Sequence, residues 1–460
     1  MAKGVVGLKK KNTPIIKNSV LIISPGLEDG GLRGIGRVMI ALVNSLPELG
    51  YNTFVLTGAP VTFRNDNQLC EITNRRMVDH YLEEGIKSSA FRLGKFRVFL
   101  GITIDVLRLL FGTSTKISSK HQLPAQHTPL TLREYEKAQG YINFYLLYKI
   151  ASRLPTRLRS LLIALIAWKG DCRTIITTTP FPLKFPVFIK KRFHIVQFVH
   201  DLMPLNILET PSDATRGFAQ DIITSVHNCD KVITSSHNAR RKLVAAVPDI
   251  DASVVYLPCS SLDQKKYLHK NHIITTNKSI GKDYILFMST LEKRKNVARL
   301  IDAFSAIHTL SPYKLVLIGN KGYGYEEIEQ SIKRLPSSAR EKIIILGYVT
   351  ESEKWSLLLN ASLVVHPAID EGLGIPVIEA LLAGVPVVAT RLDSVEEFSP
   401  EECIAYIEDP YDTSEIADKL LFAINNISSL KRATLNASPY VKEFFSDNNF
   451  RRRLKYALQE

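Results

Sequence analysis

The chain has 460 residues, of which 45% are hydrophobic and 23% are charged, so wholesale disorder and a collagen-like repeat are excluded. Its five cysteines are an odd number and lie far apart, which argues against a disulfide framework or a zinc ribbon and predicts reduced thiols in the cytoplasm. The longest apolar run, residues 161–168, is much shorter than the roughly 20 residues of a membrane-spanning helix. We therefore predict a two-domain globular protein without a transmembrane span or a signal peptide.

The formal net charge of +14 is concentrated in one segment. Residues 90–192 contain 18 Lys and Arg against 4 Asp and Glu, and bulky apolar residues are interleaved with these cations. A basic amphipathic segment of this kind favours an anionic membrane surface. An ordinary solvated face is an equal alternative. Nucleic acid is not an expected partner, because no recognisable nucleic-acid module accompanies the charge.

The first half of the chain begins with the pattern of a parallel α/β sheet, in which buried strands alternate with helices. Apolar residues predict one strand over residues 20–23 and a second over 53–56. Between them lie a glycine-rich loop over residues 26–36 and a segment of helical period over 37–49. This order predicts one β-α-β unit of a Rossmann-like domain.

The glycine-rich loop precedes a helix, so its backbone N–H groups can approach an anion or a sugar where the helix dipole is positive. It is not a nicotinamide-binding fingerprint, because the position of the third glycine is occupied by Met39. No Walker A sequence occurs in the chain, which argues against a P-loop enzyme. A tight turn without a ligand is the alternative interpretation of this loop.

A polar stretch without periodicity over residues 260–282 predicts a linker between two domains. A second series of strands and helices follows it. The predicted strands are residues 284–288, 315–318 and 342–346, and the predicted helices are residues 296–310 and 326–335. Two such series predict two Rossmann-like domains.

The most informative stretch of the sequence is residues 364–380. Glu371 follows a predicted strand and begins a Gly-x-Gly turn, and Glu379 lies one turn into the next helix. Both carboxylates can accept hydrogen bonds from sugar or ribose hydroxyls, and the backbone N–H groups between them can face a phosphate. Two glutamates at this spacing are common, so helix capping and a solvent-facing side chain are the alternative.

Residues 371–389 resemble the E-x7-E signature of retaining glycosyltransferases with the GT-B fold, a large family that includes bacterial mannosyltransferases. Residues 289–296 are similar to the family's loop with a phosphate-binding Arg and Lys. Residues 317–327 resemble its mannosyltransferase-type donor loop, and residues 346–349 the strand end beside the nucleotide base. In the first half, residues 199–205 resemble the family's His-Asp segment.

The resemblance implies that two Rossmann-like domains face each other across a central cleft, which holds a nucleotide sugar and an acceptor. It implies catalytic roles for His200, Lys295 and Glu371. Lys295 would neutralise the leaving diphosphate, Glu371 would hold the donor sugar and His200 its far edge. The donor-binding residues that it implies are Arg294, Gly319, Tyr348, Val349, Gly372, Leu373, Gly374, Ile375 and Glu379, and the acceptor and phosphate loop would contain Gly34, Gly36, Arg37 and Asp201.

One position departs from the family pattern. Many relatives have a second phosphate-binding arginine about six residues before the lysine, where this chain has Ser289. Arg294 and Arg37 are the two candidates to replace it. Glu379 is expected to bind the ribose.

The resemblance also predicts the domain boundaries. An acceptor-side domain would span residues 1–260 and contain a basic insertion at about 90–192. Residues 261–282 would form the linker, and residues 283–440 the nucleotide-sugar-binding domain. The C-terminal helix, residues 441–460, would pack back on the first domain.

The implied activity is metal-independent, retaining transfer of a hexosyl unit, with mannose from GDP-mannose as the expected donor. The expected acceptor is a lipid-linked or cell-surface polysaccharide such as O-antigen, at the inner face of the plasma membrane. No cofactor and no metal are expected, because the triplet from Asp249 to Asp251 is predicted to be a turn. A GT-B-like nucleotide-sugar epimerase and a catalytically inactive glycan-binding or scaffolding subunit are the alternatives. The sequence leaves the linkage and the oligomeric state open.

Overall fold

The protein is described from a computed structural model. The described residues are 19–24, 34–57, 140–143, 155–169, 171–200, 213–258, 280–281 and 283–459. The chain divides into two compact units. Unit 1 contains residues 1–28, 42–177 and 183–196, and unit 2 contains residues 29–41, 178–182 and 197–460.

The first sheet has seven strands among the described residues, in the order β3-β2-β1-β4-β5-β6-β7. The strands are β1 (Ser19–Ser24), β2 (Asn52–Thr57), β3 (Gly140–Asn143), β4 (Cys172–Thr177), β5 (His194–Val199), β6 (Lys231–Thr234) and β7 (Ala252–Val254). The pairs β1/β2, β1/β4, β2/β3 and β6/β7 are parallel. The side chains from Val20 to Ile23 in β1 are fully buried, as expected for an inner parallel strand that helices cover on both faces.

The helices described beside this sheet are α1 (Gly34–Ser45), η2 (Pro47–Leu49), α6 (Thr156–Lys169), α7 (Val187–Lys190), α9 (Asp213–Asn228) and α10 (His237–Ala246). Two predictions about the first of them are wrong. Gly34 and Gly36 lie in the first turn of α1 and not in the preceding loop. The first turn needs no N–H bonds within the helix, so it tolerates glycine better than the interior does. The helix also ends four residues early, at Ser45, because Pro47 cannot continue it and begins a short 3-10 helix.

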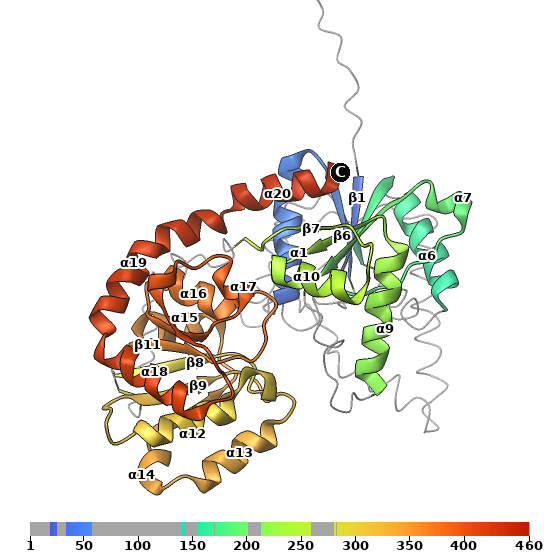
Figure 1. Cartoon of the computed structure of the whole chain (residues 1–460). Coiled ribbons are helices and arrows are strands. Elements are labelled where there is room, and N and C mark those ends of the chain that lie inside the picture. The colour runs from blue at the N-terminus through green and yellow to red at the C-terminus, as the bar shows by residue number, and fades with distance from the viewer. Residues whose placement is uncertain are drawn as a thin grey trace, which may run out of the picture. The chain divides into compact units, whose positions relative to one another are not determined.

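The second sheet has six strands, in the order β10-β9-β8-β11-β12-β13, and lies entirely in unit 2 (Figure 1). The strands are β8 (Tyr284–Met288), β9 (Lys314–Ile318), β10 (Ile343–Gly347), β11 (Leu363–His366), β12 (Val387–Thr390) and β13 (Ile404–Ile407). All five neighbouring pairs are parallel. The strands predicted over residues 284–288, 315–318 and 342–346 are confirmed to within one residue at each end.

The helices of this part of the chain include α12 and α13, which follow β8 and β9 as predicted. Their bounds are η5 (Lys293–Lys295), α12 (Val297–Ile307), α13 (Tyr325–Arg334), α14 (Ser337–Arg340), α15 (Glu351–Asn360), α16 (Ile375–Ala383), α17 (Asp393–Glu396), η6 (Glu401–Cys403), α18 (Thr413–Asn425), α19 (Ile427–Phe444) and α20 (Asp447–Gln459). The last helix, α20, contacts β6 and β7. None of the described helices combines the length and the apolar character that a membrane crossing requires.

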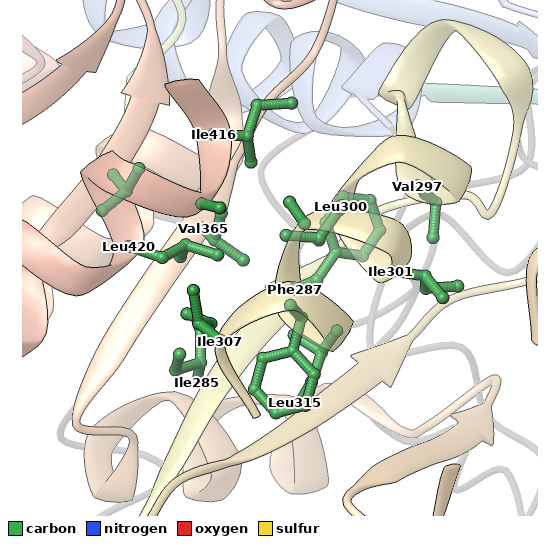
Figure 2. Close-up of a cluster of buried hydrophobic side chains, with 14 of the residues drawn as sticks. Ile285, Phe287, Val297, Leu300, Ile301, Ile307, Leu315, Val365, Ile416 and Leu420 are labelled. Carbon is green, nitrogen blue, oxygen red and sulfur yellow. The ribbon is translucent and has the colours of Figure 1, made fainter. Parts of the chain in front are cut away.

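The core of the second sheet is an apolar layer between the strands and two helices (Figure 2). Phe287 of β8, Leu315 of β9, Leu300 of α12 and Leu420 of α18 are fully buried members of this one cluster. The amphipathic period of α12 places its apolar face on the sheet, and burying each such side chain stabilises the fold by about 1.5–3 kcal/mol. This rigid layer supports the loops that leave the strands at their carboxyl ends.

The predicted domain boundaries stay a prediction, because most of the linker over residues 261–282 lies outside the described residues. In the basic segment over residues 90–192, only residues 140–143, 155–169 and 171–192 are described.

Candidate functional site

A cavity of about 750 Å³ lies in unit 2, at the carboxyl ends of β8, β9, β10 and β11. Parallel α/β sheets bind ligands at this edge, because the loops that follow the strands converge there. Thirteen of the predicted site residues line the cavity, namely Arg37, His200, Arg294, Lys295, Gly319, Tyr348, Val349, Glu371, Gly372, Leu373, Gly374, Ile375 and Glu379. Gly34 and Gly36 lie in the same helix turn as Arg37, and Asp201 lies outside the described residues.

Glu371 is the centre of one group of polar side chains in the cavity wall. Its carboxylate accepts a hydrogen bond from His366 Nε2 at 2.7 Å and one from Arg294 Nη1 at 3.3 Å, and it also contacts Lys295 Nζ. Lys295 and Glu371 are both buried, with 5% and 8% of their surface exposed. Buried charges need such partners, because an unpaired one loses its hydration without compensation.

The pKa values in this group follow from burial and from the neighbouring charges. Burial alone would raise the pKa of Glu371, but Lys295, His366 and Arg294 hold it well below its usual value. Burial lowers the pKa of Lys295 against the opposing effect of Glu371, and it also lowers the pKa of His366. His366 is therefore neutral near pH 7 and donates from Nε2. Glu371 is ionised, because its own pKa is low, and accepts this hydrogen bond.

The backbone holds this group together through two strand-end loops. The 3-10 helix η5 carries Lys295, and Asn296 ends it with a left-handed φ of 61° before α12 begins. The carbonyl of Arg294 accepts the N–H of Ile369 at 2.9 Å, which ties η5 to the loop of Glu371. Gly319, after β9, packs so closely on the loop after β8 that a Cβ would lie 1.7 Å from the carbonyl oxygen of Ser289. Only glycine fits at this position.

Glu379 is the centre of a second polar group. It lies one turn into α16 with 3% of its surface exposed, and its carboxylate contacts Arg37 Nη1 at 2.9 Å and Lys354 Nζ at 2.8 Å. The same two cations contact Glu351, and Trp355 Nε1 also donates to Glu351 at 3.1 Å. Burial would raise the pKa of Glu379, but Lys354 and Arg37 lower it. Two cations and two carboxylates thus form a balanced network.

Between the two groups, the start of α16 lines the cavity. Gly374 precedes the helix with a left-handed φ of 76°, and the residues from Gly372 to Pro376 all lie in the wall. The N-terminus of a helix carries a partial positive charge, which favours an anion such as a diphosphate. Glu371 and Glu379 thus lie on either side of the start of α16 in the cavity wall, and anion binding by this turn stays a prediction.

His200 follows β5 and lines the same cavity. Its Nε2 lies 2.7 Å from the carbonyl oxygen of Thr178, which can only accept, so Nε2 carries a proton. Ser235 Oγ donates to the carbonyl oxygen of His200 at 2.8 Å and fixes the backbone there. This histidine is half-buried, so it combines the hydrogen bond of a core residue with access to the cavity.

The D-x-D triplet lies where the sequence predicts a turn, between α10 and β7. Asp249 has a left-handed φ of 67°, and Asp251 forms an ion pair with Lys231 at 2.9 Å. Neither residue lines the cavity.

Sequence reasoning missed three members of the site, namely His366, Glu351 and Lys354. His366 ends β11 five residues before Glu371, and this proximity was a usable signal. Glu351 and Lys354 had a weaker signal. Thr350 and Glu353 form a capping box that marks the start of α15, which places Glu351 and Lys354 one turn apart at that start.

The sequence profile of the family Glycosyl transferases group 1 matches residues 270–438. In Escherichia coli, O-antigen chain mannosyltransferase B is 26% identical over 250 residues, which cover 52% of this chain and 63% of that protein. The aligned part of the chain therefore spans just under two thirds of that relative's length.

Solved structures show the same fold at low identity. Sucrose-phosphate synthase from Thermosynechococcus elongatus has a TM-score of 0.59 at 14% identity, and the match covers 96% of this chain and 98% of that chain. Anabaena HepE in complex with UDP and glucose has a TM-score of 0.59 at 14% identity, with 96% and 99% covered. Residues 270–438 are thus similar to the Glycosyl transferases group 1 family, and the protein has the GT-B fold.

Proposed function

We propose that the protein is a retaining, metal-independent hexosyltransferase that uses a nucleotide sugar. The observation that carries this proposal is that one cavity joins Lys295 and Arg294, the start of α16, and the two buried carboxylates Glu371 and Glu379. Such a wall provides separate places for a sugar, a diphosphate and a ribose.

The proposed chemistry assigns the charges as follows. When the bond between the sugar and the diphosphate breaks, its electron pair goes to the leaving phosphate oxygen. Lys295, Arg294 and the α16 dipole would stabilise the charge that develops there. The acceptor hydroxyl forms the new bond to the sugar, and its proton goes to the leaving diphosphate. Glu371 would accept hydrogen bonds from the donor sugar, and Glu379 from the ribose.

Mannose from GDP-mannose is the proposed donor, and a lipid-linked or cell-surface polysaccharide is the proposed acceptor. The support is the donor loop over residues 317–327 and the relative named O-antigen chain mannosyltransferase B. A panel of nucleotide sugars, with release of the nucleotide as the readout, tests the donor. Conversion of a nucleotide sugar without nucleotide release would identify an epimerase instead. Binding without any turnover, when candidate acceptors are supplied, would identify an inactive subunit.

Metal independence has its own test. Because side-chain cations and a helix dipole are proposed to neutralise the diphosphate, activity should survive EDTA. Loss of activity that Mg²⁺ or Mn²⁺ restores would contradict this part of the proposal.

We further propose that the protein works at the cytoplasmic face of the plasma membrane, attached peripherally to anionic lipids. Among the described residues of unit 1, α6 carries a stripe of large apolar side chains at helical spacing, and α7 adds two more. Their exposed fractions range from 38% to 76%, and the residues are Leu158, Leu161, Leu165, Trp168, Val187 and Phe188. Lys184 N–H donates to Ser160 Oγ at 2.6 Å, which ties α6 to the segment before α7. Exposed Lys190, Lys191 and Arg192 follow directly.

Liposome sedimentation tests this attachment. Wild-type protein should bind anionic vesicles in a salt-sensitive way and leave neutral vesicles unbound. Phe188→Asp and Trp168→Ser should weaken binding without changing transfer to a soluble acceptor analogue. Charge reversal at Arg92, Lys95, Arg97 and Arg108, which lie outside the described residues, should weaken it as well. Equal sedimentation with both kinds of vesicle, or none with either, would contradict the proposal.

A further inference from the structure

A second cavity in unit 2 shares no lining residue with the first. It has a volume of about 790 Å³ and lies among α10, β7, the end of α19 and α20. Three arginines and three aromatic residues contribute to its wall, namely Arg240, Arg452, Arg453, Tyr256, Phe444 and Tyr456.

The three guanidinium groups have no carboxylate within ion-pair distance among the described residues. Arg240 Nε donates to the carbonyl oxygen of Ala252 at 2.7 Å, and Arg453 Nη1 to that of Phe444 at 3.2 Å. Burial lowers the pKa of Arg453, and the neighbouring Arg452 lowers it further against the opposing effect of Tyr256.

The wall also contains one carboxylate, that of Glu397, but its hydrogen bonds go to groups other than the three arginines. It accepts the Tyr256 hydroxyl at 2.6 Å and the backbone N–H groups of His237 and Asn238 at 2.9 and 2.6 Å. Glu397 therefore stabilises the start of α10, and the arginines keep an excess of positive charge in the cavity.

Aromatic rings hold one of these cations in place. The guanidinium of Arg453 lies 4.7 Å from the ring centre of Tyr256 and 4.6 Å from that of Phe444. A planar guanidinium fixed on aromatic faces loses little freedom when it binds an anion. Tyr456, with 62% of its surface exposed, presents a further aromatic ring at the same cavity.

We propose that this cavity binds a phosphorylated small molecule that carries a ring, such as a sugar phosphate or a nucleotide. Guanidinium groups match phosphate oxygens in geometry and charge, and each hydrogen bond between them is stronger than one between neutral groups. The aromatic wall suits the face of a sugar or a base. A concave cavity lined by aromatic rings fits a small molecule better than it fits a flat lipid surface.

The structure also connects this cavity to the donor-side carboxylate through α10. The helix carries Arg240 in the second cavity, and its first turn contacts the loop of Glu371. Ser236 Oγ donates to the carbonyl oxygen of Gly372 at 2.6 Å, and Asn238 Nδ2 donates to that of Glu371 at 3.1 Å. A ligand that shifts or stiffens α10 would therefore change nucleotide affinity at the first cavity, and the nucleotide would change ligand affinity by the same factor.

Calorimetric titration of the full chain tests the site independently of turnover. The probes are mannose 6-phosphate, AMP and inorganic phosphate, with uncharged mannose as the negative control. The titrations are repeated in a Lys295→Ala background, which weakens phosphate binding at the first cavity. At least one phosphorylated probe should bind in both backgrounds with submillimolar affinity, and preference among the three probes identifies which part of the ligand is recognised.

Two variants and a matched control locate the binding. Arg452→Gln and Arg240→Gln should each reduce probe affinity about tenfold or more. Lys455→Gln removes the same charge from an exposed position of α20 outside the cavity wall and should change affinity less than twofold. Thermal melting without ligand checks that each variant is folded. Absence of probe binding, or binding that Lys295→Ala abolishes and both arginine variants leave intact, would overturn the site.

The connection to Glu371 is tested by titrating GDP and UDP with and without a saturating probe. A change of at least threefold in nucleotide affinity, abolished by Arg452→Gln, is expected. Unchanged nucleotide affinity when the second cavity is saturated would overturn the coupling. The second cavity would then bind its ligand without an effect on the first.

Discussion

Glu371 and Glu379 are two buried carboxylates in the wall of one cavity, but their surroundings are built differently. The cations that contact Glu371 are Lys295 and Arg294. Both belong to a single 3-10 helix, η5, which is the first helix after β8. The cations around Glu379 come from Arg37 in α1 and Lys354 in α15, more than 300 residues apart. Cations that are adjacent in the sequence thus contact Glu371, whereas cations far apart in the sequence contact Glu379.

The two groups also differ in how deeply their cations are buried. Lys295 is almost fully buried, and burial lowers its pKa even though Glu371 is in contact with it. A buried cation of this kind is held ready for a developing negative charge, because little water has to reorganise around it. Both groups contain two cations and two carboxylates, since Arg294 also pairs with Glu292 at 2.8 Å. The deep burial of Lys295 is what distinguishes the group around Glu371. From this difference we propose that the group around Glu371 takes part in the chemistry and that the group around Glu379 sets nucleotide affinity.

The largest expected effect comes from removing the buried cation. Lys295→Ala should reduce turnover by about 10²-fold or more, since loss of a group that stabilises a leaving oxyanion costs about 2.7–4 kcal/mol. Steady-state kinetics with saturating donor measures the effect. Lys293→Ala is the matched control, because Lys293 lies in the same 3-10 helix but pairs with Glu327 at the surface, and its turnover should stay within twofold. Near-normal turnover of folded Lys295→Ala would remove the catalytic role.

Replacing each of the two carboxylates by alanine in turn tests their proposed roles directly. Glu371→Ala should reduce transfer by about 10²-fold, because the donor sugar loses its acceptor group and Lys295 loses its partner. Glu379→Ala should instead weaken nucleotide binding by about tenfold, which corresponds to roughly 1.4 kcal/mol. Nucleotide titration and single-turnover kinetics separate the two effects. The reverse order would mean that the two roles are interchanged.

A smaller effect is expected at Lys354, one of the site residues that the sequence did not indicate. Lys354→Ala should weaken nucleotide binding by about threefold to tenfold, because Glu379 then keeps only Arg37 as a cationic partner among the described residues. Lys333→Ala, at an exposed position of α13, is the control and should leave binding unchanged. If Lys354→Ala affected turnover at saturating donor more than affinity, the division between the two groups would be wrong.

The smallest effect concerns pH and stability. The pKa of His366 lies below its ordinary value of 6.5, because burial disfavours its charged form. The unfolded chain therefore takes up a proton below pH 6.5 that the folded chain does not, so stability falls as the pH falls. Relative to His366→Gln, the unfolding free energy of the wild type should decrease by about 1 kcal/mol between pH 6.5 and 5.5.

Urea unfolding of both proteins across this pH range measures the difference. Glutamine is chosen because its amide can still donate to Glu371. Between pH 7.5 and 8.5 the difference should be constant, which serves as the control. A constant difference down to pH 5.5 would show that His366 accepts its proton in the folded state as readily as in the unfolded one.

The sequence by itself predicted three strands of the second sheet, β8, β9 and β10, and the position of Glu371 and Glu379 around a helix start. Both predictions depend on local signals: continuous apolar runs mark buried parallel strands, and glycines with a following apolar helix mark the turn. The motif resemblance predicted that Lys295 and Arg294 lie near Glu371. Their loops follow β8 and β11 of one parallel sheet, and the carboxyl ends of these strands meet at the same edge. The start of α1 was misplaced, since glycine fits a loop and a first helical turn alike.

Only the tertiary structure decided the partners of these residues. Nothing in the sequence pairs Arg37 with Glu379, or Lys354 with both Glu351 and Glu379, because long-range ion pairs leave no periodic pattern. The same holds for the second cavity, where α20 brings Arg452 and Arg453 beside Arg240 of α10. Local residue patterns specify which elements form, but the packing of helices on sheets sets which charges meet and which are left without a partner of opposite sign.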